Sequence, residues 1–239
     1  CMIIPWVRIV WISDQKGYGL VASRPIPKGT VTFAQDGLDI VIPNDGIDQV
    51  DPLMMEYVEK YSYEDYLGNR IVSWDLAKYM NHDDDANTLT TGYGFEVAVR
   101  DIEEGEEVTD DYRIFSTHHD TNFIHENRRI EEIKPWPDHL LAHWDSRVLD
   151  ALLVAGIQEQ PLLGFVPDKA WKSVCKLSQK PKTYRSVSES LPLRYKMVAF
   201  PSPVPKARKS RPSLGTAKNL LAGDLIVPTN RLKAMGGIR

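Results

Sequence analysis

Alternating apolar and polar positions divide the first half of the chain into short predicted strands. These stretches are residues 6–12, the two halves of residues 16–33 on either side of the turn "PIPKG", residues 38–42 and residues 71–74. A further stretch, "YGFEVAVRDIEEGEEVT", alternates strictly at Phe95, Val97 and Val99, then turns at Gly105 into a short strand. The pattern favours a mostly β protein with few helices over an alternating βαβ protein.

Two helices are predicted. The first is capped by Asp51 and has Pro52 at its first position. Apolar residues follow at helical spacing and are expected in the core: Leu53, Met54, Tyr57, Val58 and Tyr61. The second helix runs from a cap at Asp138 to about Ala155, with Gly156 past its end. One of its faces carries Leu141, Trp144, Val148 and Leu152.

The remainder of the chain shows little regular pattern. Beyond Pro167 the periodicity decays. The stretch "FPSPVPKARKSRPS", residues 200–213, is rich in Pro, Ser and basic residues and is expected to be extended or disordered.

Charge is distributed unevenly along the chain. Residues 1–166 carry 13 Lys and Arg against 30 Asp and Glu, whereas residues 167–239 carry 16 against 3. An acidic body attracts basic substrates such as lysine-rich segments. A basic tail can solubilise the protein, dock on the acidic body or make weak contacts with nucleic acid. The first two explanations of the tail are favoured.

The chain shows no signal for secretion or membrane insertion. Its apolar opening is interrupted by Arg8, and no apolar run approaches the ~20 residues of a membrane helix. Cys1 and Cys175 are the only cysteines, which excludes a disulfide framework and a Cys-rich zinc site. We therefore expect a cytoplasmic protein. The start at Cys rather than Met leaves open whether the natural N-terminus is present.

Three stretches carry candidate chemistry: "KGYGL" from Lys16, "KYMNHDDDANT" from Lys78, and "GEEVTDDYRIF", which contains Tyr112. The first lacks the third glycine and the following helix of a dinucleotide fingerprint. The second fits a divalent-cation loop, a surface turn, or a site in which Asn81 and His82 act. An EF-hand loop needs Gly at its sixth position and Glu at its twelfth, but the chain has Thr88 and Gly94 there.

Taken together and in this order, the three stretches resemble the SET-domain protein lysine methyltransferases over roughly residues 6–115. The chain looks closest to the compact, single-domain SET proteins of bacteria. The resemblance implies small curved antiparallel sheets around a knot-like crossing, followed by a C-terminal helix and a basic tail. The expected divisions are a SET-like catalytic domain at 1–116, a linker and helix at 117–166, and a basic, partly disordered tail at 167–239.

The resemblance also implies a function and a site. The chain would methylate lysine side chains of a protein substrate, with S-adenosylmethionine as methyl donor and Tyr112 as catalytic tyrosine. The residues implied for cofactor binding are Lys16, Gly17, Tyr18, Gly19, Asn81, His82 and Phe115. Trp136 is a further expected adenine neighbour, and the helix at 138–155 an expected lid. Tyrosines expected to line the lysine channel are Tyr63, Tyr66, Tyr79 and Tyr93.

The chain departs from the family pattern at several positions. Asp83-Asp84 replaces the family's Ser-Cys, and no cysteine follows Tyr112 until Cys175, so we expect no zinc cluster, no bound metal, and a solvated turn at the aspartates. A substitute metal site from the aspartates with His118, His119 and His125 is disfavoured.

Two further departures lie beside the tyrosine. Asp110 occupies a position where the family often has Phe or Tyr, and Arg113 replaces a Gly. A carboxylate at Asp110 would bind the lysine amine or lie outside the channel. The alternative function is therefore a catalytically inactive SET-fold module that binds a basic partner. A metal-dependent hydrolase built on residues 83–85 lacks a second motif with defined spacing.

Overall fold

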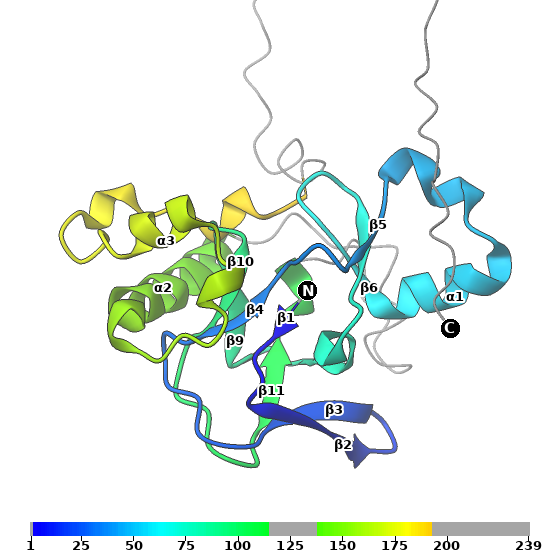
Figure 1. Ribbon diagram of the computed structural model, residues 1–239, viewed down its shortest axis with the longest axis horizontal. Coiled ribbons are helices and arrows are strands. Elements are labelled where there is room, and N and C mark those ends of the chain that lie inside the picture. The colour runs from blue at the N-terminus through cyan, green and yellow to red at the C-terminus, as the bar shows by residue number, and fades with distance from the viewer. Residues whose placement is uncertain (1, 115–137, 193–239) are drawn as a thin grey trace, which may run out of the picture. The chain divides into compact units, whose positions relative to one another are not determined.

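Short strands in small sheets make up most of the regular structure, as the hydrophobic pattern predicts. The structure is a computed structural model and describes residues 2–114 and 138–192. The strands of these two ranges lie in three sheets (Figure 1). The fold class is thus mostly β, with small antiparallel sheets and few helices.

The first sheet supplies much of the core. Its strand order is β1 (Met2–Ile3), β4 (Val31–Ala34), β10 (Phe95–Ala98) and β9 (Thr88–Thr90), and all its pairings are antiparallel. β10 lies between β4 and β9, with Phe95 opposite Ala34 and Glu96 opposite Thr90. All four residues of β10 are buried, so Glu96 is enclosed although its polar side chain alternates with the apolar ones.

The second sheet brings distant segments of the chain together. Its order is β2 (Val7–Ser13), β3 (Gly17–Ala22), β11 (Glu107–Asp110) and β8 (Asn81–His82). The β8–β11 pairing is parallel, with Asn81 opposite Thr109 and His82 opposite Asp110. The Asn-His segment therefore lies beside the strand that leads to Tyr112, two regions about thirty residues apart in the sequence.

The third sheet is small and carries a helix. It has the order β5 (Ile40–Ile42), β7 (Arg70–Val72) and β6 (Ser62–Glu64), and α1 (Pro52–Tyr61) precedes β6. The predicted cap is confirmed, since the Asp51 carboxylate accepts from Leu53 N–H at 2.8 Å.

The predicted core face of α1 is wrong. Leu53, Met54 and Tyr57 are 82%, 61% and 64% exposed, and Val58 is the buried residue of the helix. α1 lies at the margin of the described structure, on the opposite side from α2 (Figure 1). The third sheet is narrow and covers only the side of α1 that carries Val58. The spacing revealed one apolar face, but nothing in the described residues covers most of it.

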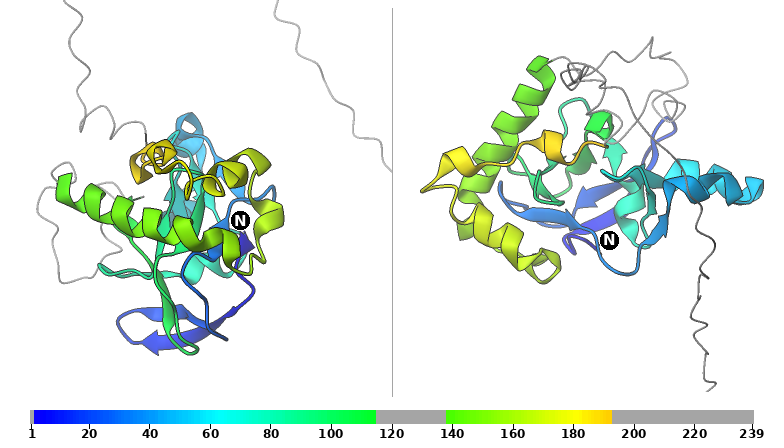
Figure 2. Two further views of the ribbon diagram at one scale, coloured as in Figure 1. Left: turned by 90° about the vertical axis from the view of Figure 1, so that its left-hand side faces the viewer. Right: turned by 90° about the horizontal axis from the view of Figure 1, so that it is seen from above.

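The helix α2 (Asp138–Val154) packs along β9 and β10 (Figure 2). Trp144, Val148 and Leu152 are buried in the core, as their spacing predicts, and Leu141 packs against it. Because neither described range has a helix both long and apolar enough, no membrane-spanning helix is found in them.

Residues 168–192 contain more structure than the decaying pattern suggested. They hold α3 (Asp168–Val174), and they contribute core residues at Val174, Leu177, Val187 and Leu191. Asp145 of α2 anchors them, because its carboxylate accepts from Tyr184 Oη, Ser186 Oγ and Val187 N at 2.7–2.8 Å. Isolated buried residues on short turns produce no helical or strand periodicity, which explains the difference.

Short 3-10 helices connect the other elements. They are η1 (Asn44–Gln49), η2 (Leu76–Tyr79), η3 (Tyr112–Ile114), η5 (Ala155–Ile157), η6 (Leu163–Phe165), η7 (Pro181–Thr183) and η8 (Val187–Glu189). Two of them matter for the site: η2 leads into β8, and η3 begins at Tyr112 immediately after β11 and Asp111.

Candidate active site

Tyr112 is held at both its backbone and its phenol. Its backbone N–H donates to His82 Nδ1 at 3.1 Å, and its hydroxyl donates to the Met80 carbonyl oxygen. Burial, followed by the negative charges of Asp110 and Glu96, raises the pKa of Tyr112 above its ordinary value. The phenol is therefore protonated at neutral pH, and its oxygen keeps lone pairs available to an incoming group.

His82 is oriented by its neighbours. Since Nδ1 accepts the Tyr112 N–H, the neutral ring carries its proton on Nε2, which faces Asp84 Oδ1 at 3.3 Å. The ring is tilted against that of Tyr112, with centroids 5.5 Å apart. Hence His82 fixes the start of η3 and presents one face to the phenol.

The three consecutive aspartates have identifiable partners. Asp83 Oδ1 accepts from Asp85 N–H at 2.9 Å, which tightens the turn. Asp84 also lies 3.3 Å from Arg113 Nη1, and Asp85 lies 3.2 Å from Arg147 of α2. The turn is exposed, as expected, but its carboxylates additionally tie β8 to η3 and α2.

Asn81 lies at the centre of a polar network around the Gly-x-Gly stretch. Its Nδ2 donates to Glu107 Oε1 at 2.8 Å and to the Tyr18 carbonyl at 3.3 Å. The other Glu107 oxygen pairs with Lys16 Nζ at 2.8 Å. The network thus joins β3, β8 and β11.

The two glycines of "KGYGL" serve different purposes. Gly17 has φ of +72°, in the left-handed region that favours glycine. Gly19 permits close approach, since a Cβ there would lie 2.6 Å from Asn81 Nδ2 and 2.8 Å from Glu107 Oε1. The motif therefore shapes a backbone edge against which polar side chains pack tightly.

Two acidic residues of this region were missed by sequence reasoning. Glu107 stands in the run "EEGEE", where nothing distinguishes it from its exposed neighbours. Asp111 is buried and accepts from Trp144 Nε1 at 2.8 Å and from Arg113 Nη2 at 2.6 Å. Arg113, a departure from the family pattern, thereby neutralises a carboxylate beside the tyrosine.

Two further acidic residues, Glu96 and Asp110, are buried near Tyr112. Burial raises the pKa of Asp110 to about 8; the hydrogen bond from Asp111 N–H acts against this rise, and the negative charge of Asp111 adds to it. Burial, and then the charge of Asp110, raise the pKa of Glu96 well above its ordinary value. Glu96 was also missed, because its place between Phe95 and Val97 in an alternating stretch is typical of a solvated side chain.

The predicted channel tyrosines do not form one group. Tyr79 lines a cavity of about 440 Å³, whose other walls include Met54, Tyr57 and Tyr61. The ring of Tyr79 meets those of Tyr18 and Tyr61 edge to face, at centroid distances of 6.4 and 6.0 Å.

The other three lie elsewhere. Tyr63 packs against Phe33, with its ring centroid 6.0 Å from that of Phe33. Tyr93 accepts from Arg185 N–H beneath residues 185–191, and Tyr66 is exposed. Of the four predicted channel tyrosines, Tyr79 is therefore the one that lines the cavity.

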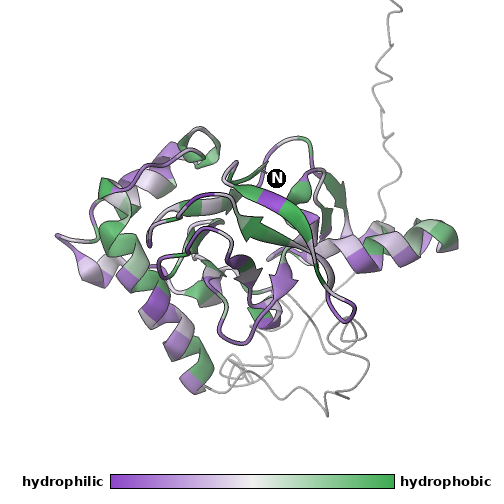
Figure 3. Ribbon diagram, turned by 90° about the horizontal axis from the view of Figure 1, so that it is seen from below, coloured by the Kyte–Doolittle hydropathy of each residue, from purple (hydrophilic) through white to green (hydrophobic). Residues whose placement is uncertain are grey.

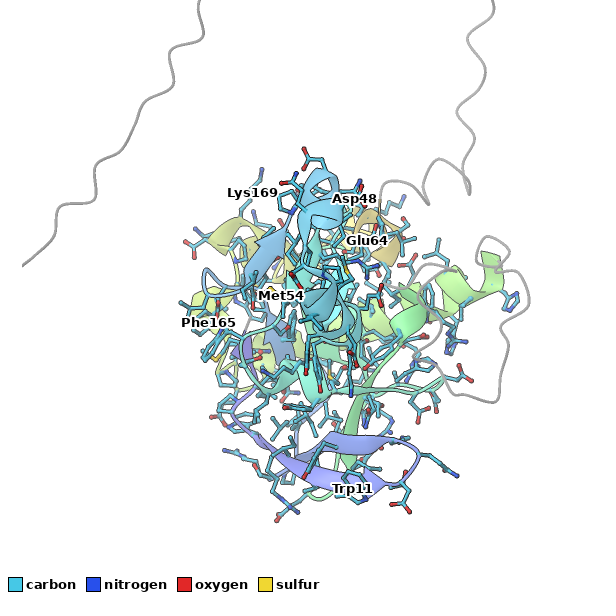
Figure 4. All side chains as sticks on the ribbon, turned by 90° about the vertical axis from the view of Figure 1, so that its right-hand side faces the viewer. Trp11, Asp48, Met54, Glu64, Phe165 and Lys169 are labelled. Carbon is cyan, nitrogen blue, oxygen red and sulfur yellow. The ribbon has the colours of Figure 1, made fainter. Side chains whose placement is uncertain are left out.

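The cavity opens on an acidic and apolar surface. Met54 faces outward from α1, with Asp48 above it and Trp11 on the β2–β3 hairpin below (Figure 4). Apolar residues also show on α1 in Figure 3. Exposed acidic residues of this region are Asp45, Asp48, Asp51, Glu56 and Glu59.

The remaining predicted residues fall outside the described ranges. These are Phe115, Trp136, His118, His119 and His125. Within residues 2–114 and 138–192, no group of three or more His, Cys, Asp or Glu side chains has the arrangement of a metal site.

Comparison with known proteins gives a family match within the N-terminal half of the chain. The family model for the SET domain matches residues 17–113. No curated protein matches the chain. Among solved structures, a histone methyltransferase candidate of Plasmodium falciparum matches with 17% identity and a TM-score of 0.34, over 46% of this chain and 95% of that one.

Proposed function

Residues 17–113 are a SET domain, and from this premise we propose that the chain is an S-adenosylmethionine-dependent methyltransferase acting on lysine side chains of a protein. The observation that carries the proposal is the parallel β8–β11 pairing. It brings the Asn81-His82 pair beside Tyr112 and the edge of Gly19. Three stretches that are separately unspecific in the sequence thus meet at one place.

The residues at this place fit the methyl donor. Because Gly19 has no Cβ, Asn81 and Glu107 approach the backbone edge closely, and Asn81, Glu107 and Lys16 offer a donor, an acceptor and a cation for an amino acid head group. When bound, S-adenosylmethionine supplies a methyl group on a positively charged sulfur. His82 would lie beside it, fixed by its bond to Tyr112.

Tyr112 would act by alignment. Its proton is engaged by the Met80 carbonyl, so its oxygen offers lone pairs to the amine and to the polarised methyl hydrogens. In-line displacement is faster with such alignment. Reactants that are already held in place on the enzyme lose less translational and rotational entropy on reaching the transition state. The amine must arrive neutral, since a protonated nitrogen has no electron pair to donate.

The acidic surface around α1 favours a basic substrate. Residues 35–66 contain Lys60 as their single basic residue. Clustered negative charge raises the local concentration of lysine-rich segments. The cavity beside Met54 and Tyr79 offers apolar area for a neighbouring side chain of such a segment. We further propose that the chain acts in the cytoplasm, following the sequence-based expectation.

One observation favours a second function. Asp110 is a buried carboxyl close to Tyr112, and a SET-fold module without turnover would tolerate it. Such a module would hold a basic partner on the same acidic surface and transfer no methyl group.

The test separates the two. Calorimetry measures S-adenosylmethionine binding to the full chain, and mass spectrometry then follows methyl transfer to lysine-rich proteins. Binding with transfer supports the methyltransferase, whereas binding to the basic proteins without transfer supports the module. Absence of cofactor binding contradicts the proposed function.

A further inference from the structure

Two carboxyl groups are buried in the core behind Tyr112. Glu96 is 4% exposed and Asp110 is 2% exposed. Along β11 alternate residues share a face, so Asp110 points to the same side as Val108, which is completely buried in the core. Burying carboxyl groups is costly unless each is hydrogen-bonded or neutral, so this pair requires an explanation.

The two carboxyls are incompletely satisfied. Asp110 Oδ1 accepts from Asp111 N–H at 2.7 Å. In the part of the chain that the structure describes, Glu96 Oε2 is buried and has no hydrogen-bond partner. Native proteins rarely leave a buried carboxyl oxygen unpaired, and a catalytic role is one of the explanations for such an atom.

The charges of both carboxyls act on the Tyr112 phenol. The charge of Glu96 acts on the phenols of both Tyr63 and Tyr112, and that of Asp110 acts on Tyr112. The pair therefore lies within electrostatic reach of the hydroxyl that would align the amine. A donor placed between Tyr112 and the pair would meet three oxygen-bearing side chains.

Neighbouring charges do not neutralise the pair. Asp111 is the nearest further carboxylate, and it is engaged by Arg113 and Trp144. Asp39 and Asp65 act on Tyr63, and Glu107 acts on Tyr112, where all three add negative charge. This surrounding field favours a cation or a proton at the pair.

We propose that Glu96 and Asp110 form the proton acceptor of this enzyme, receiving the lysine ammonium and taking one proton from it. The proposal rests on the proposed function and adds two residues to it. The N–H bond breaks and an O–H bond forms on the carboxylate. The freed electron pair would then form the bond to the methyl carbon that S-adenosylmethionine supplies, and the carbon–sulfur bond would break with its electrons left on sulfur.

Burial makes this transfer favourable. In water a lysine, with a pKa of about 10.4, holds its proton against any ordinary carboxylate. In a buried site the charged forms of both partners lose solvation, which raises the carboxyl pKa and lowers that of the amine. The Asp110 pKa of about 8 brings the two groups within reach of each other.

Infrared spectroscopy tests the pair on the full chain without cofactor, near pH 8. The variants are Asp110→Asn and Glu96→Gln, with the exposed Glu104→Gln as matched control. We expect a protonated-carboxyl band in the parent and the control that each pair variant weakens. Added n-butylamine, which has the head of a lysine side chain, should strengthen the band in the parent only. An unchanged or weakened band in the parent overturns the proposal.

The pH dependence of methyl transfer provides the second measurement. Asp110→Asn should lower the rate near pH 8, where Asp110 is about half ionised, by about 10²-fold, as loss of a general base does. The rate should recover about tenfold per pH unit as the free amine itself deprotonates toward its pKa of about 10.4. Parent-like rates in both pair variants, or a loss that rising pH does not recover, overturn the proposal. If the parent transfers no methyl group, the proposed function fails, and the infrared result alone decides whether the pair accepts protons.

Discussion

Replacing Asp110 by Asn should change how stability depends on pH. The folded-state pKa of Asp110 is about 8, against an ordinary value of 3.8. Between these values the folded chain holds a proton that the unfolded chain has released. The free energy of unfolding therefore falls as pH rises through this window.

The size of the effect follows from the width of the window. Each pH unit within it costs about 1.4 kcal/mol for one fully titrating group, so the interval from about pH 5 to about pH 8 costs at most about 4 kcal/mol. Asp110→Asn removes this titration and keeps an Oδ1 acceptor for Asp111 N–H. Because Glu96 titrates with Asp110, we expect the variant to recover about half of the loss or more.

Urea unfolding across this pH range, followed by circular dichroism, measures the difference. The variant and the parent should have similar stability near pH 5, and the variant should be more stable by about 2–4 kcal/mol near pH 8. Glu104→Gln, a change at an exposed glutamate, should follow the parent curve. Parallel curves for Asp110→Asn and the parent would show that Asp110 titrates as it does in water.

Two other substitutions probe the close approach and the anchor of the C-terminal segment. Gly19→Ala places a methyl group 2.6 Å from Asn81 Nδ2. Calorimetry should therefore show at least about tenfold weaker S-adenosylmethionine binding, a loss of roughly 1.4 kcal/mol. Gly37→Ala is the control: its methyl group meets no atom within 4 Å, and the variant should bind as the parent does. Asp145→Asn weakens three hydrogen bonds to residues 184–187 and should cost about 2–3 kcal/mol in thermal unfolding, because hydrogen bonds to a charged group are each worth about 1.5–3 kcal/mol. The exposed Asp150→Asn on the same helix is the control, and equal loss in both variants would remove Asp145 as an anchor.

Sequence patterns predicted the helices and strands well, because caps and apolar spacing depend on residues close together in the sequence. The cap of α1 depends on Asp51 and on the backbone N–H of Leu53, two residues later. The buried face of α2 depends on the spacing of apolar residues within one helix. Whether a face is covered depends on distant segments. Leu53 and Met54 have the spacing of core residues but meet no covering element among the described residues.

The candidate site shows the same division. The structure brings together Lys16, Tyr18, Gly19, Asn81, His82 and Tyr112, which the sequence motifs singled out. Their roles in binding and transfer remain predictions. Glu96 was missed because alternation along β10 predicts a polar, exposed face there, whereas the structure buries all four residues of the strand. Single-strand periodicity cannot report such packing.

Methyl transfer by the parent chain and by Tyr112→Phe tests the central claim most directly. Both proteins are incubated with isotope-labelled S-adenosylmethionine and a lysine-rich protein, and mass spectrometry follows labelled lysine with time. The substitution removes the hydroxyl that donates to the Met80 carbonyl and would align the amine. We expect labelled lysine with the parent, transfer slower by about 10²–10³-fold with the variant, and nearly equal cofactor affinity in both. No labelled lysine with the parent, or equal rates for the two proteins with the fold intact, would contradict the account.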